Sequence, residues 1–206
     1  MYVKSFPINP TYILGGAIAV YENVWEDNEN TIDEVLKLAS DISSNVRFVP
    51  SQTNGDYENG NEFHQSIRTS YSLSITKIAQ FNEVFRQINN KCYELISSAV
   101  HNYRGIFKIE EEIIDVEPYG LLRYSGGEEY KFHYDGGTES KRSISVLVYL
   151  NDDYSGGEIE FPNFKVKIKP KAGTLILFPS NYAYGHIAHP VESGTKYVIA
   201  TWLHDR

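Results

Sequence analysis

The residues best suited to bind a metal lie in the segment 130–135, where aromatic residues alternate with His133 and Asp135. Successive side chains of a β-strand point to opposite faces, so the aromatic residues would share one face and His133 and Asp135 the other. The aromatic residues are Tyr130, Phe132 and Tyr134. We expect their face to enter the core, which leaves an imidazole and a carboxylate side by side on the opposite face.

Two later histidines, His186 and His189, are candidates for a third ligand. They are three residues apart and would face opposite sides of an extended strand, so both cannot easily serve one metal. Two histidines and one carboxylate on one face of an iron are the ligands of non-haem Fe(II) oxygenases, whose remaining positions stay open for a co-substrate and oxygen. A cation follows at Lys196.

These residues belong to a series of five pieces of sequence that follow one another in a fixed order. They are Arg123–Gly127 leading to His133–Asp135, then Val148–Asn151, Gly156–Glu158, Gly173–Ser180, and His186 leading to Lys196–Tyr197. In order and approximate spacing, the segment from Leu122 to His204 resembles the core of the prolyl 4-hydroxylase branch of the Fe(II)/2-oxoglutarate dioxygenases. The resemblance covers somewhat less than half of the chain.

The resemblance implies a role for several residues. In the family pattern the distal histidine lies about ten residues before a basic residue, with Pro-Val and a glycine between them, and His186 fits that spacing to Lys196. The implied metal ligands are therefore His133, Asp135 and His186, while His189 would line the pocket or brace a neighbour. Lys196 would pair with the distal carboxylate of 2-oxoglutarate, and Tyr124 resembles the family tyrosine that assists there. Trp202 is a candidate pocket wall.

The activity implied by the resemblance is hydroxylation of a prolyl residue in a peptide or protein, with release of succinate and CO2. It would use Fe(II), 2-oxoglutarate as co-substrate, O2 and ascorbate. No catalytic residue beyond the metal ligands is required, and the sequence assigns no substrate-binding residue. Two alternatives stay open: a hydroxylase of a free amino acid or other small molecule, and a non-catalytic jelly-roll binding module.

Composition limits the possible partners. The formal net charge of -8 over 206 residues, with a pI near 5.3, argues against a nucleic-acid partner. Cys92 is the only cysteine, which precludes an intramolecular disulfide and fits a reducing compartment. The apolar run from Ile13 to Val20 is too short to span a bilayer. We therefore expect no membrane association and a cytoplasmic protein.

The first half of the chain is expected to be mainly helical. Thr31–Glu34 is a capping-box pattern followed by a short amphipathic helix to Ile42, and apolar residues at helical spacing from Ile75 to Ala99 predict one long core-facing helix that buries Cys92. The polar stretch from Ser43 to Ser74 is either a substrate lid or a surface excursion, and the resemblance favours a lid. Within it, His64 is expected to be solvated, and Arg68–Ser70 resembles a family segment.

The second half is expected to be a series of short strands. Their predicted ranges are 113–116, 121–124, 130–134, 144–150, 158–161, 164–168, 174–178 and 197–203. Strands of this number and length favour a double-stranded β-helix, or jelly roll, in an α+β fold. We expect one domain over 1–206, with 1–112 as helical support and lid loop and 113–206 as the jelly-roll core. Lys165, Lys167 and Lys169 are expected on a solvated edge-strand face without a binding role.

Overall fold

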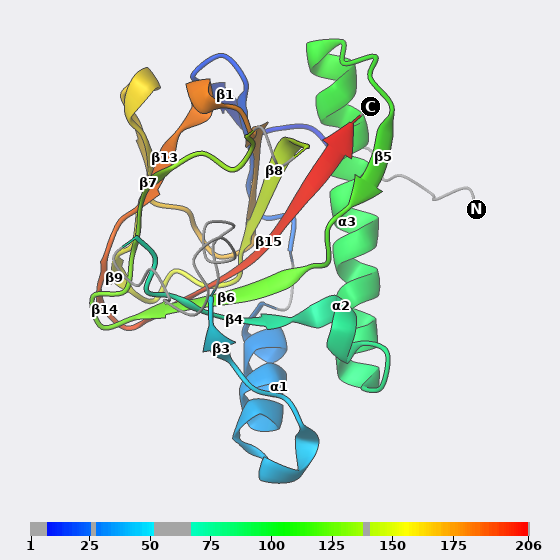
Figure 1. Cartoon of the computed structure of the whole chain (residues 1–206), viewed down its shortest axis with the longest axis vertical. Coiled ribbons are helices and arrows are strands. Elements are labelled where there is room, and N and C mark those ends of the chain that lie inside the picture. The colour runs from blue at the N-terminus through cyan, green and yellow to red at the C-terminus, as the bar shows by residue number, and fades with distance from the viewer. Residues whose placement is uncertain (1–7, 26–27, 52–66, 138–140, 206) are drawn as a thin grey trace.

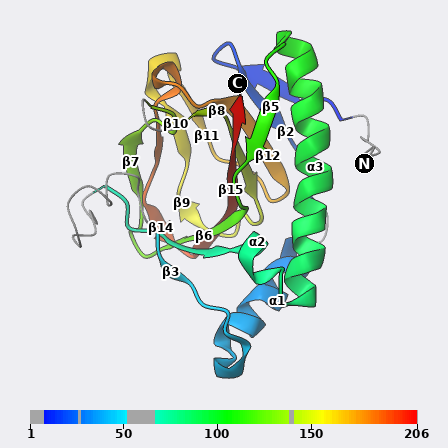
Figure 2. The same cartoon turned by 45° about the vertical axis from the view of Figure 1, so that its right-hand side comes forward.

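The computed structural model describes residues 8–25, 28–51, 67–137 and 141–205. The chain folds into two antiparallel sheets that pack against each other, with a further two-stranded pair and with helices along the outer side of the larger sheet (Figures 1 and 2). This arrangement is the double-stranded β-helix, or jelly roll, in an α+β fold that the strand pattern predicts.

The larger sheet has nine strands in the order β1-β2-β12-β8-β15-β6-β4-β3, and β5 also pairs with β15. Their bounds are β1 (Tyr12–Leu14), β2 (Ile18–Tyr21), β3 (Val49–Pro50), β4 (Tyr71–Ser74), β5 (Ile113–Val116), β6 (Gly120–Ser125), β8 (Arg142–Tyr149), β12 (Thr174–Pro179) and β15 (Thr195–Asp205). Four of these strands come from the first half of the chain, so that half supplies both edges of the sheet as well as the helices.

The smaller sheet has the order β11-β10-β13-β7, and β14 pairs separately with β9. The bounds are β7 (Tyr130–His133), β9 (Ser155–Gly156), β10 (Ile159–Phe161), β11 (Val166–Ile168), β13 (His186–Ala188) and β14 (Val191–Ser193). Hydrophobic residues fill both sides of the larger sheet. On β12, Leu175 and Leu177 belong to the core shared with the helices, whereas Ile176 and Phe178 belong to the core between the sheets.

Three α-helices support the larger sheet: α1 (Asn28–Ser40), α2 (Ile75–Ile78) and α3 (Glu83–Phe107), of which α3 runs along the molecule in Figures 1 and 2. Short 3-10 turns are η1 (Ile42–Ser44), η3 (Pro162–Phe164) and η4 (Tyr182–Tyr184). None of the helices in the described part of the chain is long and apolar enough to cross a membrane.

The helix predictions are correct in place but wrong in two details. The stripe from Ile75 onward forms two helices, because the Asn82 side chain accepts a hydrogen bond from the Phe85 N–H and starts α3 afresh. Phe81, expected on the buried stripe, lies in that break and is 62% exposed. In α1 the helix begins at Asn28, so Thr31 is not its N-cap. Cys92 is fully buried, as predicted.

The expected burial of the aromatic face of β7 is wrong. Phe132 and Tyr134 are each 52% exposed. His133 and Asp135 point into the pocket, so Phe132 and Tyr134, which alternate with them, point outward. Tyr130 faces the pocket because of a bulge: His186 pairs with His133 and Ala188 with Tyr130, so that a three-residue step on β7 faces a two-residue step on β13. As a result Tyr130 stacks on the His133 ring, with 3.4 Å between centroids, and both residues line one pocket.

Candidate metal centre

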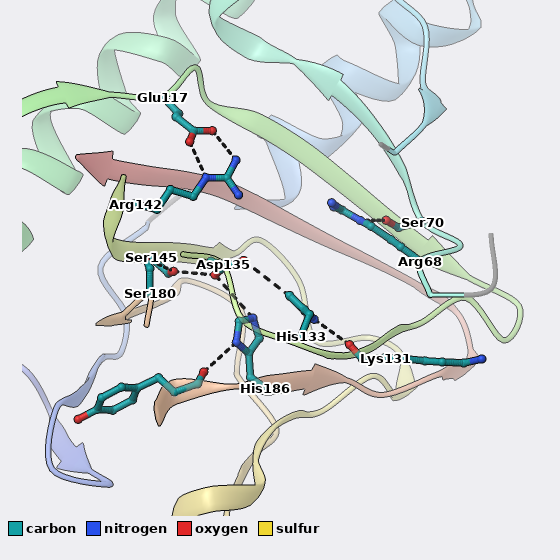
Figure 3. A network of polar contacts seen from close by, with 11 residues as sticks. Arg68, Ser70, Glu117, Lys131, His133, Asp135, Arg142, Ser145, Ser180 and His186 are labelled. Carbon is teal, nitrogen blue, oxygen red and sulfur yellow. Dashed lines mark hydrogen bonds and ion pairs between the residues drawn. The ribbon is translucent and has the colours of Figure 1, made fainter. Parts of the chain in front are cut away.

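Three metal-binding side chains meet at the smaller sheet. His133 ends β7, Asp135 follows two residues later, and His186 begins β13 as the direct partner of His133. One ligand atom from each residue lies within 4.8 Å of the others. The three side chains point toward one another in Figure 3, although His186 is distant from the other two in sequence.

Hydrogen bonds orient each of the three groups. The His133 Nδ1 lies 2.7 Å from the Lys131 carbonyl oxygen, and the His186 Nδ1 lies 3.1 Å from that of Tyr184. A carbonyl oxygen can only accept, so both Nδ1 atoms carry the proton and both Nε2 atoms present a lone pair. The Nε2 atoms lie 3.7 and 3.8 Å from the Asp135 carboxylate, too far for hydrogen bonds.

Asp135 is braced by two buried hydroxyl groups. The Ser145 Oγ on β8 donates to the Asp135 Oδ2 at 2.6 Å and lies 2.8 Å from the Ser180 Oγ, which follows β12 (Figure 3). Both serines are almost fully buried. One oxygen of the carboxylate is therefore held in place from the larger sheet, which lies behind it.

The protonation states suit metal binding. Burial, with a smaller effect from the neighbouring His186, lowers the pKa of His133 to about 3, so its imidazole is neutral at neutral pH. Burial by itself would raise the pKa of Asp135. His186, His133 and Ser145 outweigh burial and hold that pKa below its ordinary value, so the carboxylate is ionised. The cluster thus offers the neutral imidazole of His133 and an anionic oxygen of Asp135, beside the ring nitrogen of His186.

Lys196 lies at the other side of the same pocket. Its side chain is 2% exposed, and its Nζ donates to the Gly157 carbonyl at 3.0 Å and lies 4.4 Å from the centroid of the Tyr124 ring. Lys196 and Tyr124 are direct partners between β15 and β6. Burial, and then repulsion by Lys169, lower the pKa of Lys196 to about 7. A buried cation of this kind is stabilised when an anion binds beside it.

The second half of the chain matches a known family. Residues 119–204 match the model of the 2OG-Fe(II) oxygenase superfamily, and the curated relatives found are prolyl 4-hydroxylases. Over these residues the chain is similar to the prolyl 4-hydroxylases of this superfamily.

Two relatives show how far the likeness extends. A putative prolyl 4-hydroxylase of Acanthamoeba polyphaga mimivirus is 31% identical over 112 residues, which cover 45% of this chain and 46% of the relative. Probable prolyl 4-hydroxylase 9 of Arabidopsis thaliana is 33% identical over 119 residues, covering 44% of this chain and 41% of the relative. The chain thus spans less than half the length of these two relatives.

Solved structures share the fold of this chain. A prolyl hydroxylase from Trichoplax adhaerens, in complex with a peptide fragment of hypoxia inducible factor, superposes with a TM-score of 0.71 at 22% identity, covering 93% of this chain and 84% of the other. The viral collagen prolyl hydroxylase of Paramecium Bursaria Chlorella virus-1, in its 2OG complex, superposes with a TM-score of 0.62 at 23% identity. This superposition covers 92% of this chain and 96% of the other.

The residues of this site fit Fe(II) and 2-oxoglutarate. Two imidazoles and a carboxylate are the ligand set of non-haem Fe(II), and the ammonium of Lys196 is bonded to a neutral carbonyl, which leaves its charge available for a carboxylate. His133, Asp135, His186, Tyr124 and Lys196 all line one pocket. The residues that the sequence singles out are therefore brought together.

His189 lies apart from this pocket. Its Nε2 is 2.6 Å from the Glu160 carboxylate, which also pairs with Lys167. The prediction that His186 and His189 face opposite ways holds, because only His186 lies in the metal-binding cluster. His189 braces its strand to β10.

The supporting roles of several residues near this site were not identified from the sequence. Ser145 and Ser180 are one example, and a second is the cluster in which Glu117 binds Arg142 through two hydrogen bonds (Figure 3). Glu117 accepts another hydrogen bond from His204 at 2.9 Å. The Arg142 guanidinium also lies 3.8 Å from the centroid of the Trp202 ring, and Trp202 lines the pocket. No local motif marks Ser145, Glu117 or Arg142, because they meet their partners only through pairing of distant strands. Ser180 ends the Gly173–Ser180 piece, and Trp202 was expected as a pocket wall.

Proposed function

We propose that this chain is an Fe(II)- and 2-oxoglutarate-dependent dioxygenase that hydroxylates a prolyl residue in a peptide or protein. One observation carries the proposal: the His133, Asp135 and His186 cluster and the buried ammonium of Lys196 line the same pocket. The family match over residues 119–204 supports the same reaction.

Each group has a defined task in this proposal. His133, Asp135 and His186 would hold Fe(II), which supplies the redox chemistry that couples reduction of O2 to substrate hydroxylation and to decarboxylation of 2-oxoglutarate. Lys196 would bind the distal carboxylate of 2-oxoglutarate, with Tyr124 beside it. The apolar and aromatic walls of the pocket exclude water, which strengthens that ion pair.

A peptide or protein substrate is favoured by the surface beside the metal centre. Phe132 and Tyr134 alternate with the metal ligands along the chain and are each 52% exposed, and Tyr182, which precedes His186, is 79% exposed. These side chains do not line the pocket but lie on the outer surface, where they supply apolar area that only a partner extending beyond the pocket could cover. A free amino acid would leave that area uncovered. Most of the expected substrate lid, residues 52–66 with His64 among them, lies outside the described residues.

The test is an assay of the purified protein with Fe(II), 2-oxoglutarate, O2 and ascorbate. A panel of proline-containing peptides and free proline would be supplied, with succinate and the mass gain of one oxygen as readouts. We expect a peptide to gain the oxygen and succinate to form with it. Succinate with oxygen found only in free proline would reassign the substrate to small molecules, and absence of succinate from the active-site-intact protein would favour a binding module.

A further inference from the structure

The turn that joins β9 to β10 is held by two lysines. Gly156 and Gly157 both have a φ of +67°, a conformation that glycine adopts readily. The Lys169 Nζ donates to the Gly156 carbonyl and, at 3.0 Å, to the Tyr154 carbonyl. The Lys196 Nζ donates to the next carbonyl, that of Gly157, at 3.0 Å. Consecutive carbonyls of one glycine turn are thus each bonded to an ammonium group.

Lys169 differs from the lysines beside it. The side chains of Lys167 and Lys171 are 52% and 74% exposed, and they pair with the surface carboxylates of Glu160 and Asp152. Lys169 is only partly exposed, and its Nζ lies 3.6 Å from the centroid of the buried Tyr154 ring. The expectation that Lys169 lies on a solvated face is therefore wrong. The physical reason is that β11 ends at Ile168, which frees Lys169 from strand alternation.

Fixing the Gly156 carbonyl also fixes the direction of the carbonyl that follows. The peptide unit between Gly156 and Gly157 is planar, and its N–H donates to the Pro190 carbonyl at 2.8 Å while its C=O accepts from Lys169. With that plane held on both sides, Gly157 has few remaining ways to aim its own carbonyl at Lys196. Glycine needs this restraint more than other residues because its backbone is the least restricted.

We propose that Lys169 is a positioning residue for the co-substrate site, holding the Gly156–Gly157 turn so that the Lys196 ammonium is aimed at the distal carboxylate of 2-oxoglutarate. This inference rests on the proposed function. The positive charge of Lys169 should also favour binding of 2-oxoglutarate, because it adds to the attraction that a dianion meets at this end of the pocket.

The test compares Lys169→Met with Lys169→Arg and with Lys171→Met, a matched loss of one surface charge. Binding is measured by calorimetric titration of 2-oxoglutarate into protein carrying Zn(II), which has no redox chemistry. The second ligand is 2-oxopentanoate, which has the same chain length but no distal carboxylate. We expect Lys169→Met to weaken 2-oxoglutarate binding about tenfold, equivalent to about 1.4 kcal/mol, with no change for 2-oxopentanoate. Lys169→Arg and Lys171→Met should bind as the wild type does.

Steady-state kinetics provide a second readout. In Lys169→Met the KM for 2-oxoglutarate should rise while kcat stays unchanged, because positioning affects binding of the co-substrate rather than the reaction at the metal. Equal weakening for both ligands, or unchanged binding of 2-oxoglutarate, would overturn the role of Lys169 while leaving the proposed function intact. Wild-type protein that binds no 2-oxoglutarate would overturn both.

Discussion

His133 and His186 are direct partners across β7 and β13, with their ring centroids 4.2 Å apart and their planes inclined by 59°. Each ring is turned by a hydrogen bond from its Nδ1 to a main-chain carbonyl two residues earlier in the chain. The two Nε2 atoms thus face the same carboxylate, that of Asp135. Strand pairing, rather than any local motif, creates this metal-binding geometry.

His186 and His189, three residues apart, offer a matched comparison. His186→Ala should abolish binding of Fe(II) and of Co(II), because it removes one of three ligands. His189→Ala should leave metal binding intact and only break the surface pair with Glu160. Metal content after dialysis, together with the visible spectrum of the Co(II)-loaded protein, measures both. Loss of metal in His189→Ala with retention in His186→Ala would reverse the assignment.

Removal of the other ligands should abolish turnover. His133→Ala and Asp135→Ala should each eliminate succinate production from 2-oxoglutarate, since two remaining ligands hold the metal poorly. Circular dichroism would serve as the control for folding. Full retained activity in both variants would refute the metal centre described above.

The Ser145 hydroxyl should strengthen metal binding through Asp135. Ser145→Ala is expected to weaken Zn(II) affinity about tenfold, the lower end of the effect of losing a partner that orients a ligand. Ser180→Ala should have a smaller effect, because Ser180 contacts Ser145 and not the carboxylate in the bonds described here. Competition with a chelating dye measures both affinities. A larger effect of Ser180→Ala on the Zn(II) affinity would contradict the prediction that Ser145 is the main residue orienting Asp135.

Burial of the Lys196 ammonium should lower the free energy of unfolding when no anion is bound beside it. Burial, then Lys169, lower its pKa from 10.5 to about 7, so between these values the unfolded chain binds more protons than the folded one. The free energy of unfolding should therefore rise with pH from about 7 to 10.5, by at most about 5 kcal/mol. In Lys196→Met that rise should disappear.

The same substitution separates stability from binding. At pH 7 and below, Lys196→Met should be more stable than the wild type in urea unfolding, yet it should lose affinity for 2-oxoglutarate. Affinity of the wild type should also fall as the pH rises above the pKa of Lys196, because the ammonium is lost. A variant that is less stable and still binds 2-oxoglutarate would contradict the placement of this cation in the pocket.

Substitution of two glycines with left-handed backbones distinguishes the cost of backbone strain from the cost of a steric clash. Gly126→Ala should lower the free energy of unfolding by about 1 kcal/mol, because a residue with a Cβ is strained at its φ of +51°. No clash adds to this cost, since nothing lies within 4 Å of an added Cβ. Gly156→Ala should destabilise by at least about 2 kcal/mol more, since the Cβ would collide with the Pro190 carbonyl oxygen as well. Urea unfolding measures both values, and equal losses would mean that the turn can shift.

Local patterns in the sequence predicted most of the strands. The range predicted for β5 is the observed one, and those for β6, β8 and β12 are correct within two residues at each end. Short apolar runs between glycine and proline turns carry this information directly. The break at Asn82 was missed because a capping residue within an apolar stripe does not interrupt the hydrophobic period.

The candidate ligands were also readable from the sequence, since His133, Asp135, His186, Tyr124 and Lys196 fit a spaced pattern and line one pocket. Their functional roles stay predictions. The inward turn of Tyr130 was not readable, because a bulge between β7 and β13 places it on the same side as His133. Phe132 points outward because the face of His133, and not the aromatic face, lines the pocket between the sheets.

The sequence by itself determined the strand pattern and the α+β class, because both depend on residue type and local spacing. It also indicated the candidate ligands, where the choice of His186 over His189 came from the resemblance to a family pattern. The tertiary structure alone decided which distant groups support them: Ser145 and Ser180 behind Asp135, and Lys169 behind the turn that meets Lys196. These contacts join strands or turns far apart in the chain, so no local spacing encodes them. They exist only once the two sheets have closed on each other.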